Sequence, residues 1–334
     1  MTGAAVAGIV AVSFGFVGCW TPECGHSYLA SGNGRIYFLR SLPGGSYLCV
    51  YDSEDKTLLG EYPTPGEHSC HITLLEHQAV VCDYTSGTLS LYTLDEDGLP
   101  VEAPSVMRFS GCGPDLVRQA SPHIHSSWVS PDGGSLIVAD LGSDKLYRFA
   151  IQDGRIDADS REDFSAPSGS GPRHCAFNPD GSHLYVSTEL SDEVLVYSYP
   201  DMSLVQRMEV NPLHPRGGGH VALSPDGRFL YASSRLQGDG IAVFVVGSDG
   251  LLTKAGYTFT GSHPRHFAIS SDGLRLMVAC RDSGTIETYA IDPSTGLLSP
   301  QSDTIRVEKP VFVLFMAHFS KNSLHLRLNE LNRL

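Results

Sequence analysis

The sequence predicts an all-β protein: a seven-bladed β-propeller of four-stranded antiparallel blades, closed by pairing of the N- and C-terminal strands. Short apolar segments alternate with turns throughout the 334 residues, which include 35 Gly and 20 Pro. A unit of about 46 residues recurs along the chain, and this period is typical of propeller blades. An apolar segment lies near each end of the chain, so the two ends can share one blade and leave no sheet edge free.

The clearest copy of the unit spans residues 171–197, with three strand-like segments and a tight turn after the first of them. In this turn proline presets φ and glycine accepts a positive φ. Four such turns occur, at Ser130–Gly133, Asn178–Gly181, Ser224–Gly227 and Ser270–Gly273. Their aspartates, at positions 132, 180, 226 and 272, are 48, 46 and 46 residues apart, which indicates successive blades.

An anchor residue near the start of each first strand extends the series to both ends of the chain. The seven anchors are Ser27, His71, His125, His174, His220, His266 and Phe312. The segment Ser13–Val17 is predicted to complete the blade that begins near Val311. We therefore expect a single propeller over residues 1–317, followed by a tail, residues 318–334, to which no role is assigned. The long polar loop Asp95–Pro122 is expected to cap one face of the ring.

The net charge of −14 limits the partners that the protein can have. A strongly negative chain repels phosphate backbones and anionic lipid surfaces, so neither nucleic acid nor a membrane is expected as a partner. A small anionic substrate remains compatible with this charge, provided that it binds in a locally basic pocket. No run of residues is long and apolar enough to predict a membrane span. The sequence does not indicate an oligomeric state.

The eight cysteines indicate a cytoplasmic protein, because none forms a CxxC pair or another metal-binding spacing. Cys49, Cys82, Cys175 and Cys280 lie within apolar segments, as buried reduced thiols do. The alternative is an exported lipoprotein attached through Cys19. Because the apolar N-terminus has no Lys or Arg before Cys19, the cytoplasmic interpretation is preferred.

Residues that differ between the copies are the candidates for a functional site. The position before the anchor is occupied by Ile124, Arg173, Gly219 and Arg265 in the clear copies. Two arginines placed alike in separate blades suit a phosphate or carboxylate ligand, which the guanidinium fork binds bidentately. The bend after the second strand carries Tyr84, Leu141, Glu189, Arg235 and Arg281. Glu189 is thus one carboxylate among basic and neutral groups that converge on the axis, although a lone glutamate at a strand end can also be a solvated charge.

The other candidates also have both a functional and a structural interpretation. The recurring histidines His71, His174, His220 and His266 either bind substrate or donate hydrogen bonds to the backbone of the neighbouring blade. His125 fits either role. Arg235 and Arg281 either bind substrate or form a second layer or plain surface charges. Because the histidines come one per blade without local ligand pairs, no metal is predicted, and no cofactor is expected. The sequence has no GxSxG nucleophile motif, no HExxH zinc motif and no P-loop that would suggest another chemistry.

Four segments of the repeat resemble one known family. They are PHIHSSWVSPDG (122–133), SGPRHCAFNPDGSHLYVSTELSDEVLVYSY (170–199), HVALSPDGRFLYASSRLQGDGIAVFVV (220–246) and HPRHFAISSDGLRLMVAC (263–280). Together they resemble the propeller-type lactonases, which include the YbhE-type 6-phosphogluconolactonases and the fungal carboxy-cis,cis-muconate cyclases. The resemblance covers residues 70–316. It departs from the family pattern at Thr188, where an asparagine is usual, and at Asp83, where asparagine is also common.

The resemblance implies a seven-bladed propeller with a catalytic site at His125, Arg173, Glu189 and Arg265. It implies hydrolysis of a sugar-acid δ-lactone, with 6-phosphogluconolactone as the foremost substrate. Either Glu189 or His125 would act as the general base on water without a metal, and the two arginines would bind the anion and the developing oxyanion. The alternatives are a lactonizing cyclase or isomerase that uses the same residues, and a non-catalytic propeller that binds partners on its rim.

Overall fold

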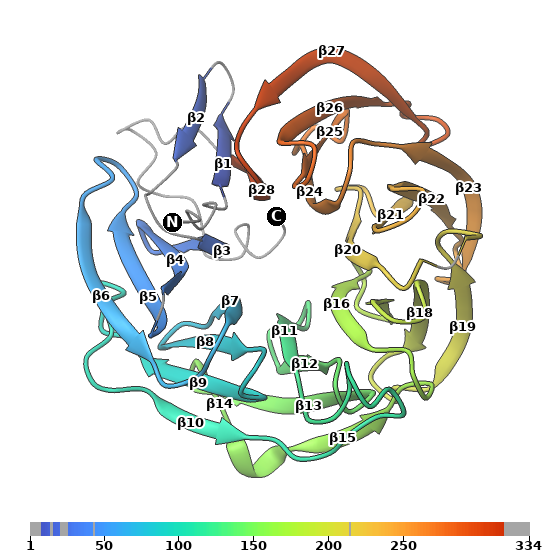
Figure 1. The fold of residues 1–334 in the computed structure, drawn as a ribbon. Coiled ribbons are helices and arrows are strands. Elements are labelled where there is room, and N and C mark those ends of the chain that lie inside the picture. The colour runs from blue at the N-terminus through green and yellow to red at the C-terminus, as the bar shows by residue number, and fades with distance from the viewer. Residues whose placement is uncertain (1–7, 14–15, 21–25, 43, 214, 317–334) are drawn as a thin grey trace.

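The protein is a ring of β-sheets arranged around a central axis (Figure 1). The computed structural model describes residues 8–13, 16–20, 26–42, 44–213 and 215–316. Six of its sheets are antiparallel blades, which confirms the predicted all-β propeller. The predicted tail, residues 318–334, lies outside the described residues.

Within each blade the strands run in sequence order from the axis outward. The innermost strands are β3 (His26–Gly32), β7 (Ser69–Leu74), β11 (Ile124–Val129), β16 (Pro172–Phe177), β20 (Gly218–Leu223) and β24 (Pro264–Ile269). The second strands are β4 (Arg35–Leu42), β8 (Gln78–Asp83), β12 (Ser135–Asp140), β17 (His183–Thr188), β21 (Phe229–Ser234) and β25 (Arg275–Cys280). The third strands are β5 (Gly45–Asp52), β9 (Thr88–Thr93), β13 (Lys145–Gln152), β18 (Glu193–Ser198), β22 (Gly240–Val246) and β26 (Thr285–Ile291). The outer strands are β6 (Leu58–Thr64), β10 (Ser105–Arg108), β15 (Glu162–Ser165), β19 (Leu204–Glu209), β23 (Leu252–Phe259) and β27 (Leu298–Arg306).

One blade has an additional short strand, β14 (Arg155–Ile156), which pairs with the end of β13. A 3₁₀ turn, η1 (Ala158–Ser160), follows it before the outer strand β15. Asp157 caps this turn, because its side chain accepts a hydrogen bond from the backbone N–H of Asp159. The described residues contain no helix with the length and hydropathy needed to cross a membrane.

A three-stranded sheet joins the two ends of the chain between the β3–β6 blade and the β24–β27 blade (Figure 1). Its strands are β28 (Pro310–Met316), β1 (Gly8–Ser13) and β2 (Phe16–Trp20). The two ends therefore pair, but the segment that pairs with β28 is Gly8–Ser13, which shares only Ser13 with the predicted Ser13–Val17, and the pair is parallel. The prediction of a four-stranded antiparallel sheet at this place is wrong for the described strands, because apolar composition marks a strand without specifying its direction or register.

The four predicted turns have one shared geometry. In each of them the N–H of the fourth residue donates to the carbonyl of the first, at 2.8 to 3.0 Å. The glycine in the fourth position has a φ between 70° and 74° in all four turns, a backbone conformation that other residues rarely adopt. The serine of three of them also donates its hydroxyl to the turn aspartate. The turn motif read from the sequence is thus confirmed in its hydrogen bonds and its dihedral angles.

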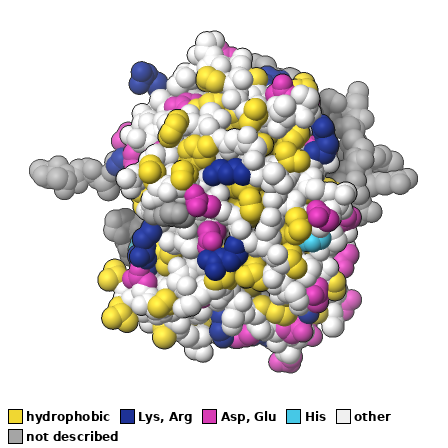
Figure 2. Space-filling model, turned by 90° about the vertical axis from the view of Figure 1, so that its right-hand side faces the viewer, with side chains coloured by type: hydrophobic (Ala, Val, Ile, Leu, Met, Phe, Trp, Pro, Cys, Tyr) yellow, Lys and Arg dark blue, Asp and Glu magenta, His cyan; other side chains and the backbone are white. Residues whose placement is uncertain are grey.

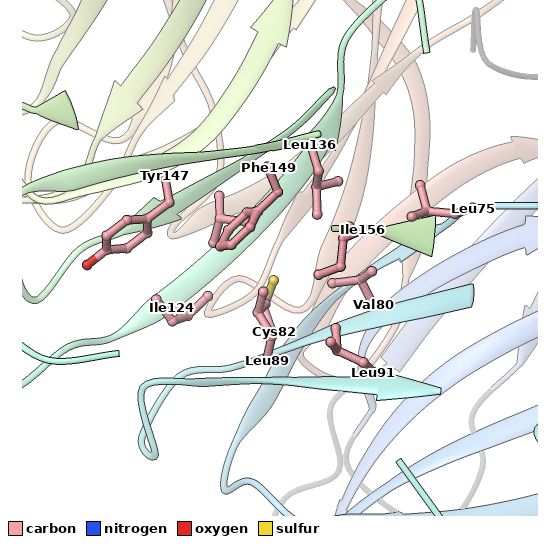
Figure 3. Close-up of a cluster of buried hydrophobic side chains, with 11 residues drawn as sticks. Leu75, Val80, Cys82, Leu89, Leu91, Ile124, Leu136, Tyr147, Phe149 and Ile156 are labelled. Atoms are coloured by element: carbon pink, nitrogen blue, oxygen red, sulfur yellow. The ribbon is translucent and has the colours of Figure 1, made fainter. Parts of the chain in front are cut away.

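The hydrophobic core is divided into clusters that lie between adjacent blades. One cluster joins the β7–β10 blade to the β11–β15 blade, with Val80 and Leu89 on one side and Leu136 and Phe149 on the other (Figure 3). Tyrosine hydroxyls add polar links of the same kind: Tyr185 donates to the carbonyl of Gly250 in the next blade, at 2.9 Å. Because every interface couples two neighbouring blades, the ring holds the innermost strands in fixed positions around the axis.

Candidate active site

A β-bulge recurs near the start of the innermost strands and turns one side chain towards the axis. In β16, Pro172 pairs with Thr188 and His174 pairs with Ser187, so that Arg173 has no partner across the ladder. β7, β11 and β24 skip one residue in the same way. The bulged residues of these strands are Cys70, His125, Arg173 and Arg265. Bulges commonly redirect a side chain next to an active site, and here they do so in several blades at the same level.

The bulge corrects the predicted register of His125. In β11, Ile124 pairs with Asp140 and Ser126 pairs with Ala139, which leaves His125 at the bulge. His125 is therefore equivalent to Arg173 and not to the anchor histidines. The anchor position of this blade is held by Ser126, whose hydroxyl donates to the carbonyl of Arg173 at 2.6 Å. The turn spacing agrees with the structure, because Ser126 lies six residues before the turn aspartate Asp132, as His174 does before Asp180. Taking His125 as the anchor shifted this copy by one residue.

The bulged residues surround a small cavity on the axis. Its volume is about 10 Å³, roughly the room that one water molecule needs. The cavity is lined by Tyr28, Cys70, His125, Arg173, His174, Arg265, His266, Val311 and Phe312. Three of the four predicted catalytic residues thus converge on one space, and the fourth, Glu189, is hydrogen-bonded to Arg173.

Six aromatic rings, which we call the axial ring, pack against one another around the axis. They are Tyr28, His71, His174, His220, His266 and Phe312. Neighbouring ring centroids are 4.0 to 5.7 Å apart. Only His174 and His266 of the four histidines line the cavity. The histidines accordingly serve first as packing groups that fill the centre of the propeller.

The polar atoms of the axial ring are satisfied mainly within the ring or by the next blade. His174 and His220 share a hydrogen bond between their Nδ1 atoms, at 2.8 Å. His71 accepts from the backbone N–H of Ser127, and His266 accepts from that of Val313, each at 3.4 Å. The histidines therefore accept hydrogen bonds from the neighbouring blade, whereas the sequence led us to expect donation.

Burial keeps the axial histidines uncharged. Burial is the largest cause and neighbouring charged or titratable groups add to it; together they lower the pKa of His71 and of His220 to about 3. Burial likewise holds the pKa of His174 and His266 well below the ordinary value, with Arg173 and His220 adding to the effect. An imidazolium in this apolar packing would lose its hydration without gaining a counter-ion.

Glu189 lies at the centre of an arginine cluster beside the cavity. Its Oε2 accepts from Arg173 at 3.0 Å and from Arg235 at 2.9 Å, and its Oε1 accepts from Arg118 at 2.5 Å. Burial raises the pKa of this carboxyl, but Arg235 and Arg173 outweigh burial and hold the pKa well below the ordinary value. Glu189 is therefore a largely buried group that is ionised at neutral pH, and it is not the solvated charge that a strand-end glutamate usually is.

Arg173 and Arg235 are held rigidly, since both also donate to backbone carbonyls. Arg173 donates to the carbonyl of Gly219, and Arg235 donates to those of Gly217 and Gly218, at 2.8 to 3.0 Å. The glycines make this approach possible. A Cβ on Gly219 would come within 2.3 Å of the Ser233 hydroxyl. The run of three glycines before His220 thus permits a close approach to the neighbouring backbone and to Ser233, and it supplies the carbonyls that Arg173 and Arg235 bind.

Arg265 differs from the other arginines of the cluster. Among the described residues it makes neither a hydrogen bond nor an ion pair, although it lines the cavity. Burial and the like charge of Arg235 lower its pKa to about 10. Arg265 is only partly buried, and a guanidinium group that is partly removed from water and lacks an ion-pair partner is available to an anionic ligand. Its environment is therefore prepared for an anionic or polar oxygen that enters the cavity.

His125 is also available to a ligand. Its Nδ1 is buried and has no hydrogen-bond partner among the described residues. Its ring packs edge-on against Tyr84 and His174, with centroids 5.7 and 5.2 Å away. Burial and the charge of Arg173 hold its pKa well below the ordinary value, so the imidazole is neutral and can accept a proton.

Arg118 belongs to the cluster although the sequence comparison did not select it. It lies in the long loop between β10 and β11, and it also donates to the hydroxyl of Tyr84 at 3.3 Å. The predicted loop thus reaches over the mouth of the site. Because the loop is not part of the repeat, comparing the copies could not find Arg118. A usable signal was that Arg118 is the single Lys or Arg between Arg108 and Lys145.

Two of the predicted bend residues do not join the cluster. Arg281 is partly exposed and pairs with its neighbour Asp282 at 3.1 Å. Leu141 is fully buried and contributes its backbone carbonyl to the side chain of Gln119. Tyr84 contacts the cluster through Arg118 and stacks on His123, with ring centroids 4.5 Å apart.

The arginine cluster is an island of positive charge in an acidic protein. It contains four guanidinium groups and one carboxylate, from Arg118, Arg173, Arg235, Arg265 and Glu189. On the outer side of the ring, in contrast, acidic and basic side chains are interspersed (Figure 2). The described residues include no group of three or more His, Cys, Asp or Glu side chains placed to hold a metal ion. The arrangement can thus bind an anion and offer a neutral imidazole to a polar reactant.

Comparisons with known proteins agree with this chemistry. Residues 25–315 match the family model described as "Lactonase, 7-bladed beta-propeller". The 6-phosphogluconolactonase of Bacillus subtilis (strain 168) is 30% identical over 298 residues, which cover 85% of this chain and 84% of the relative. A solved structure from Bacteroides fragilis has a TM-score of 0.82 at 34% identity and covers 89% of each chain. The periplasmic gluconolactonase of Pseudomonas aeruginosa has a TM-score of 0.77 at 25% identity and covers 88% of each chain.

Proposed function

The chain belongs to the seven-bladed β-propeller lactonase family, and on this premise we propose that it hydrolyses a sugar-acid δ-lactone, with 6-phosphogluconolactone as the foremost substrate. The observation that carries the proposal is the cavity where Arg265, without a counter-ion, faces the neutral His125. A δ-lactone presents a carbonyl oxygen that gains negative charge when water attacks. One cation and one base on the same small space are what this reaction requires.

His125 acts as the general base in this proposal. Both oxygens of Glu189 accept hydrogen bonds from arginines, which makes the carboxylate a weak base. His125 has a ring nitrogen without a partner among the described residues; burial and Arg173 lower its pKa, and the negative charge of Glu189 raises it and so strengthens the base. Glu189 then has a positioning role: it holds Arg173 in place and stabilises the imidazolium that forms when His125 takes a proton.

Besides the lactone, the proposed reaction consumes only water. The water oxygen forms a bond to the carbonyl carbon of the lactone while one of its protons passes to His125. Arg265 stabilises the negative charge on the carbonyl oxygen. The bond between the carbonyl carbon and the ring oxygen then breaks, and the ring oxygen takes the proton back from His125. The product is the open-chain hydroxy acid. The proposed reaction involves neither a metal nor an intermediate covalently bound to the protein.

The proposal also includes the seventh blade and the preference for a phosphorylated lactone. We take the sheet of β28, β1 and β2 as the seventh blade, since the family model is described as seven-bladed. The relatives also act on two different lactones by name, one phosphorylated and one not. The net local charge of the arginine cluster favours the phosphorylated one.

The test is hydrolysis of 6-phosphogluconolactone by the purified protein, measured as acid release in a pH-stat, together with His125→Gln. The wild type is expected to accelerate hydrolysis, and His125→Gln is expected to lose about 10²- to 10⁴-fold in kcat. A His125→Gln variant of wild-type activity would remove His125 as the base. A wild type without activity on any lactone, but active in closing a muconate to a lactone, would establish the cyclase alternative. Inactivity in both assays would leave the non-catalytic propeller.

A further inference from the structure

Arg118 is the outermost arginine of the cluster. Its side chain is 38% exposed, whereas those of Arg173 and Arg235 are 3% and 5% exposed. The contacts run inward from solvent in one series: Arg118 to Glu189, Glu189 to Arg173, and Arg173 to the cavity wall. Arg118 therefore lies at the mouth of the proposed active site.

Arg118 can leave its place more easily than the inner arginines can. Arg173 and Arg235 are each fixed by backbone carbonyls in addition to Glu189. Among the residues that the structure describes, the Arg118 side chain hydrogen-bonds to two side-chain atoms, Oε1 of Glu189 and the hydroxyl of Tyr84. A rotation about its side-chain bonds would release both contacts without disturbing the backbone.

The loop that carries Arg118 is clamped on both sides of this residue. Asp115 accepts hydrogen bonds from the backbone N–H groups of Val117 and Arg118, and it forms an ion pair with Arg216 across the site. Gln119 is fully buried and donates to the carbonyl of Leu141. The backbone at Arg118 is thus fixed. Only the conformation of the Arg118 side chain can change.

A substrate needs more room than the site now offers. The cavity holds roughly one water molecule, which is too small for a six-membered lactone ring. Since the inner arginines and the axial ring are fixed, the contacts of Arg118 are those that an entering ligand can displace. An anionic group on the ligand would compete with Glu189 for this guanidinium, because phosphate and carboxylate bind it in the same bidentate way.

From this geometry we propose that Arg118 binds the anionic group at the end of the lactone remote from the carbonyl, and so makes the site selective for phosphorylated sugar lactones. The inference rests on the proposed lactonase function and deepens it. When Arg118 turns to the phosphate, Oε1 of Glu189 becomes open to a hydroxyl group of the sugar, while Oε2 keeps both inner arginines in place. Binding of the anion thereby completes the site for the sugar.

The test compares two lactones that differ in one phosphate group. Glucono-δ-lactone and 6-phosphogluconolactone are assayed with the wild type, Arg118→Ala and Arg118→Lys. The wild type is expected to prefer the phosphorylated lactone. Arg118→Ala is expected to raise KM for this lactone about 100-fold and to change kcat/KM for the neutral lactone by less than about fivefold. Arg118→Lys keeps the charge without the fork and should fall between the two.

A matched control is Arg207→Ala. Arg207 is also a partly exposed arginine in an ion pair, with Glu193 at 2.8 Å, but it lies on the outer strand β19. It should leave both lactones unaffected. A binding assay by calorimetry with the products, 6-phosphogluconate against gluconate, gives a second reading that does not depend on turnover. Arg118→Ala should weaken binding of the phosphorylated acid alone.

The outcomes separate this inference from the proposed function. A wild type that hydrolyses both lactones, with an Arg118→Ala variant that loses the same factor on each, would mean that Arg118 only positions Glu189. An Arg118→Ala variant that retains the wild-type preference would also overturn the inference and leave the lactonase function intact. A wild type that neither hydrolyses the two lactones nor binds their products would overturn both the lactonase function and the inference about Arg118. If the wild type is inactive but binds 6-phosphogluconate in a way that depends on Arg118, the lactonase function is overturned and the anion site at Arg118 remains.

Discussion

The axial ring and the arginine cluster are neighbours built from adjacent residues of the same strands. In β16 the bulged Arg173 belongs to the cluster, and the following residue, His174, belongs to the ring. The ring uses aromatic groups from six strands and keeps its histidines neutral by burial. The cluster takes its charged side chains from three successive blades and from the loop before β11, and it gathers charge in the same low-dielectric region.

This difference shows how a repeated fold acquires a specific site. Residues at the repeated positions form the packing that every blade needs. The residue at the bulge beside them is not required for this packing. Because the bulge removes one residue from the ladder, that residue is free to vary without loss of strand pairing. The chain has placed cysteine, histidine and arginine there. The comparison therefore predicts that low pH and substitutions of packing residues affect the ring. Substitutions that change a charge are predicted to affect the cluster.

The largest expected effect is acid destabilisation through the ring. His71, His174, His220 and His266 have depressed pKa values in the folded state, so between pH 6.5 and about 3 the unfolded chain binds more protons. Stability is thus fully present above pH 6.5 and is lost as the pH falls. Each histidine should cost about 1 kcal/mol between pH 6.5 and 5.5, or about 4 kcal/mol together. Urea denaturation at pH 7.5, 6.5 and 5.5 measures this, and a pH-independent free energy of unfolding would contradict it.

The next largest effect is expected on the stability of the arginine cluster, when its central carboxylate is removed. Glu189→Gln removes the one negative charge that compensates Arg118, Arg173 and Arg235. Loss of one partner from a buried ion pair costs about 3 to 5 kcal/mol, because the remaining charges stay buried and unpaired. The midpoint of urea unfolding at pH 7.5 should fall accordingly. A variant as stable as the wild type would mean that solvent reaches these arginines.

Arg265→Ala separates function from stability. Because Arg265 has no counter-ion among the described residues, its removal should leave the free energy of unfolding unchanged or slightly raised. Its loss from the proposed oxyanion site should lower kcat by about 10²- to 10³-fold. Equilibrium unfolding and steady-state kinetics on the same preparation test both parts. Retained activity would exclude Arg265 from the reaction.

The smallest effect is expected at His71, which lies in the axial ring and does not line the cavity. His71→Phe keeps the ring contact with Tyr28, removes a buried Nε2 that has no partner among the described residues, and gives up the long hydrogen bond of 3.4 Å from the N–H of Ser127. Stability at pH 7.5 should change by less than about 1.5 kcal/mol, and kcat/KM should remain close to that of the wild type. The acid sensitivity should decrease by the share of one histidine. A large loss of activity would place His71 in the site instead.

The sequence predicted those parts of the molecule that repeat. The turn tetrads gave the blade period, and the Pro-Arg pairs at Arg173 and Arg265 together with the bend at Glu189 located most of the cluster. His125 was assigned to the wrong register because a histidine was taken as the anchor, although it lies seven residues and not six before the turn aspartate Asp132. Arg118 was missed because its loop has no counterpart in the other blades. The parallel pairing of β1 with β28 also has no sequence signal, since strand direction depends on where the chain enters the sheet.

A crystal structure with 6-phosphogluconate bound tests the central claim most directly, namely that residues turned inward by bulges form one anion-binding catalytic site on the axis. The carboxylate of the product, which derives from the lactone carbonyl, is expected within hydrogen-bond distance of both Arg265 and His125. A carboxylate bound away from these two side chains, or a ligand on the outer rim of the ring, would contradict the account.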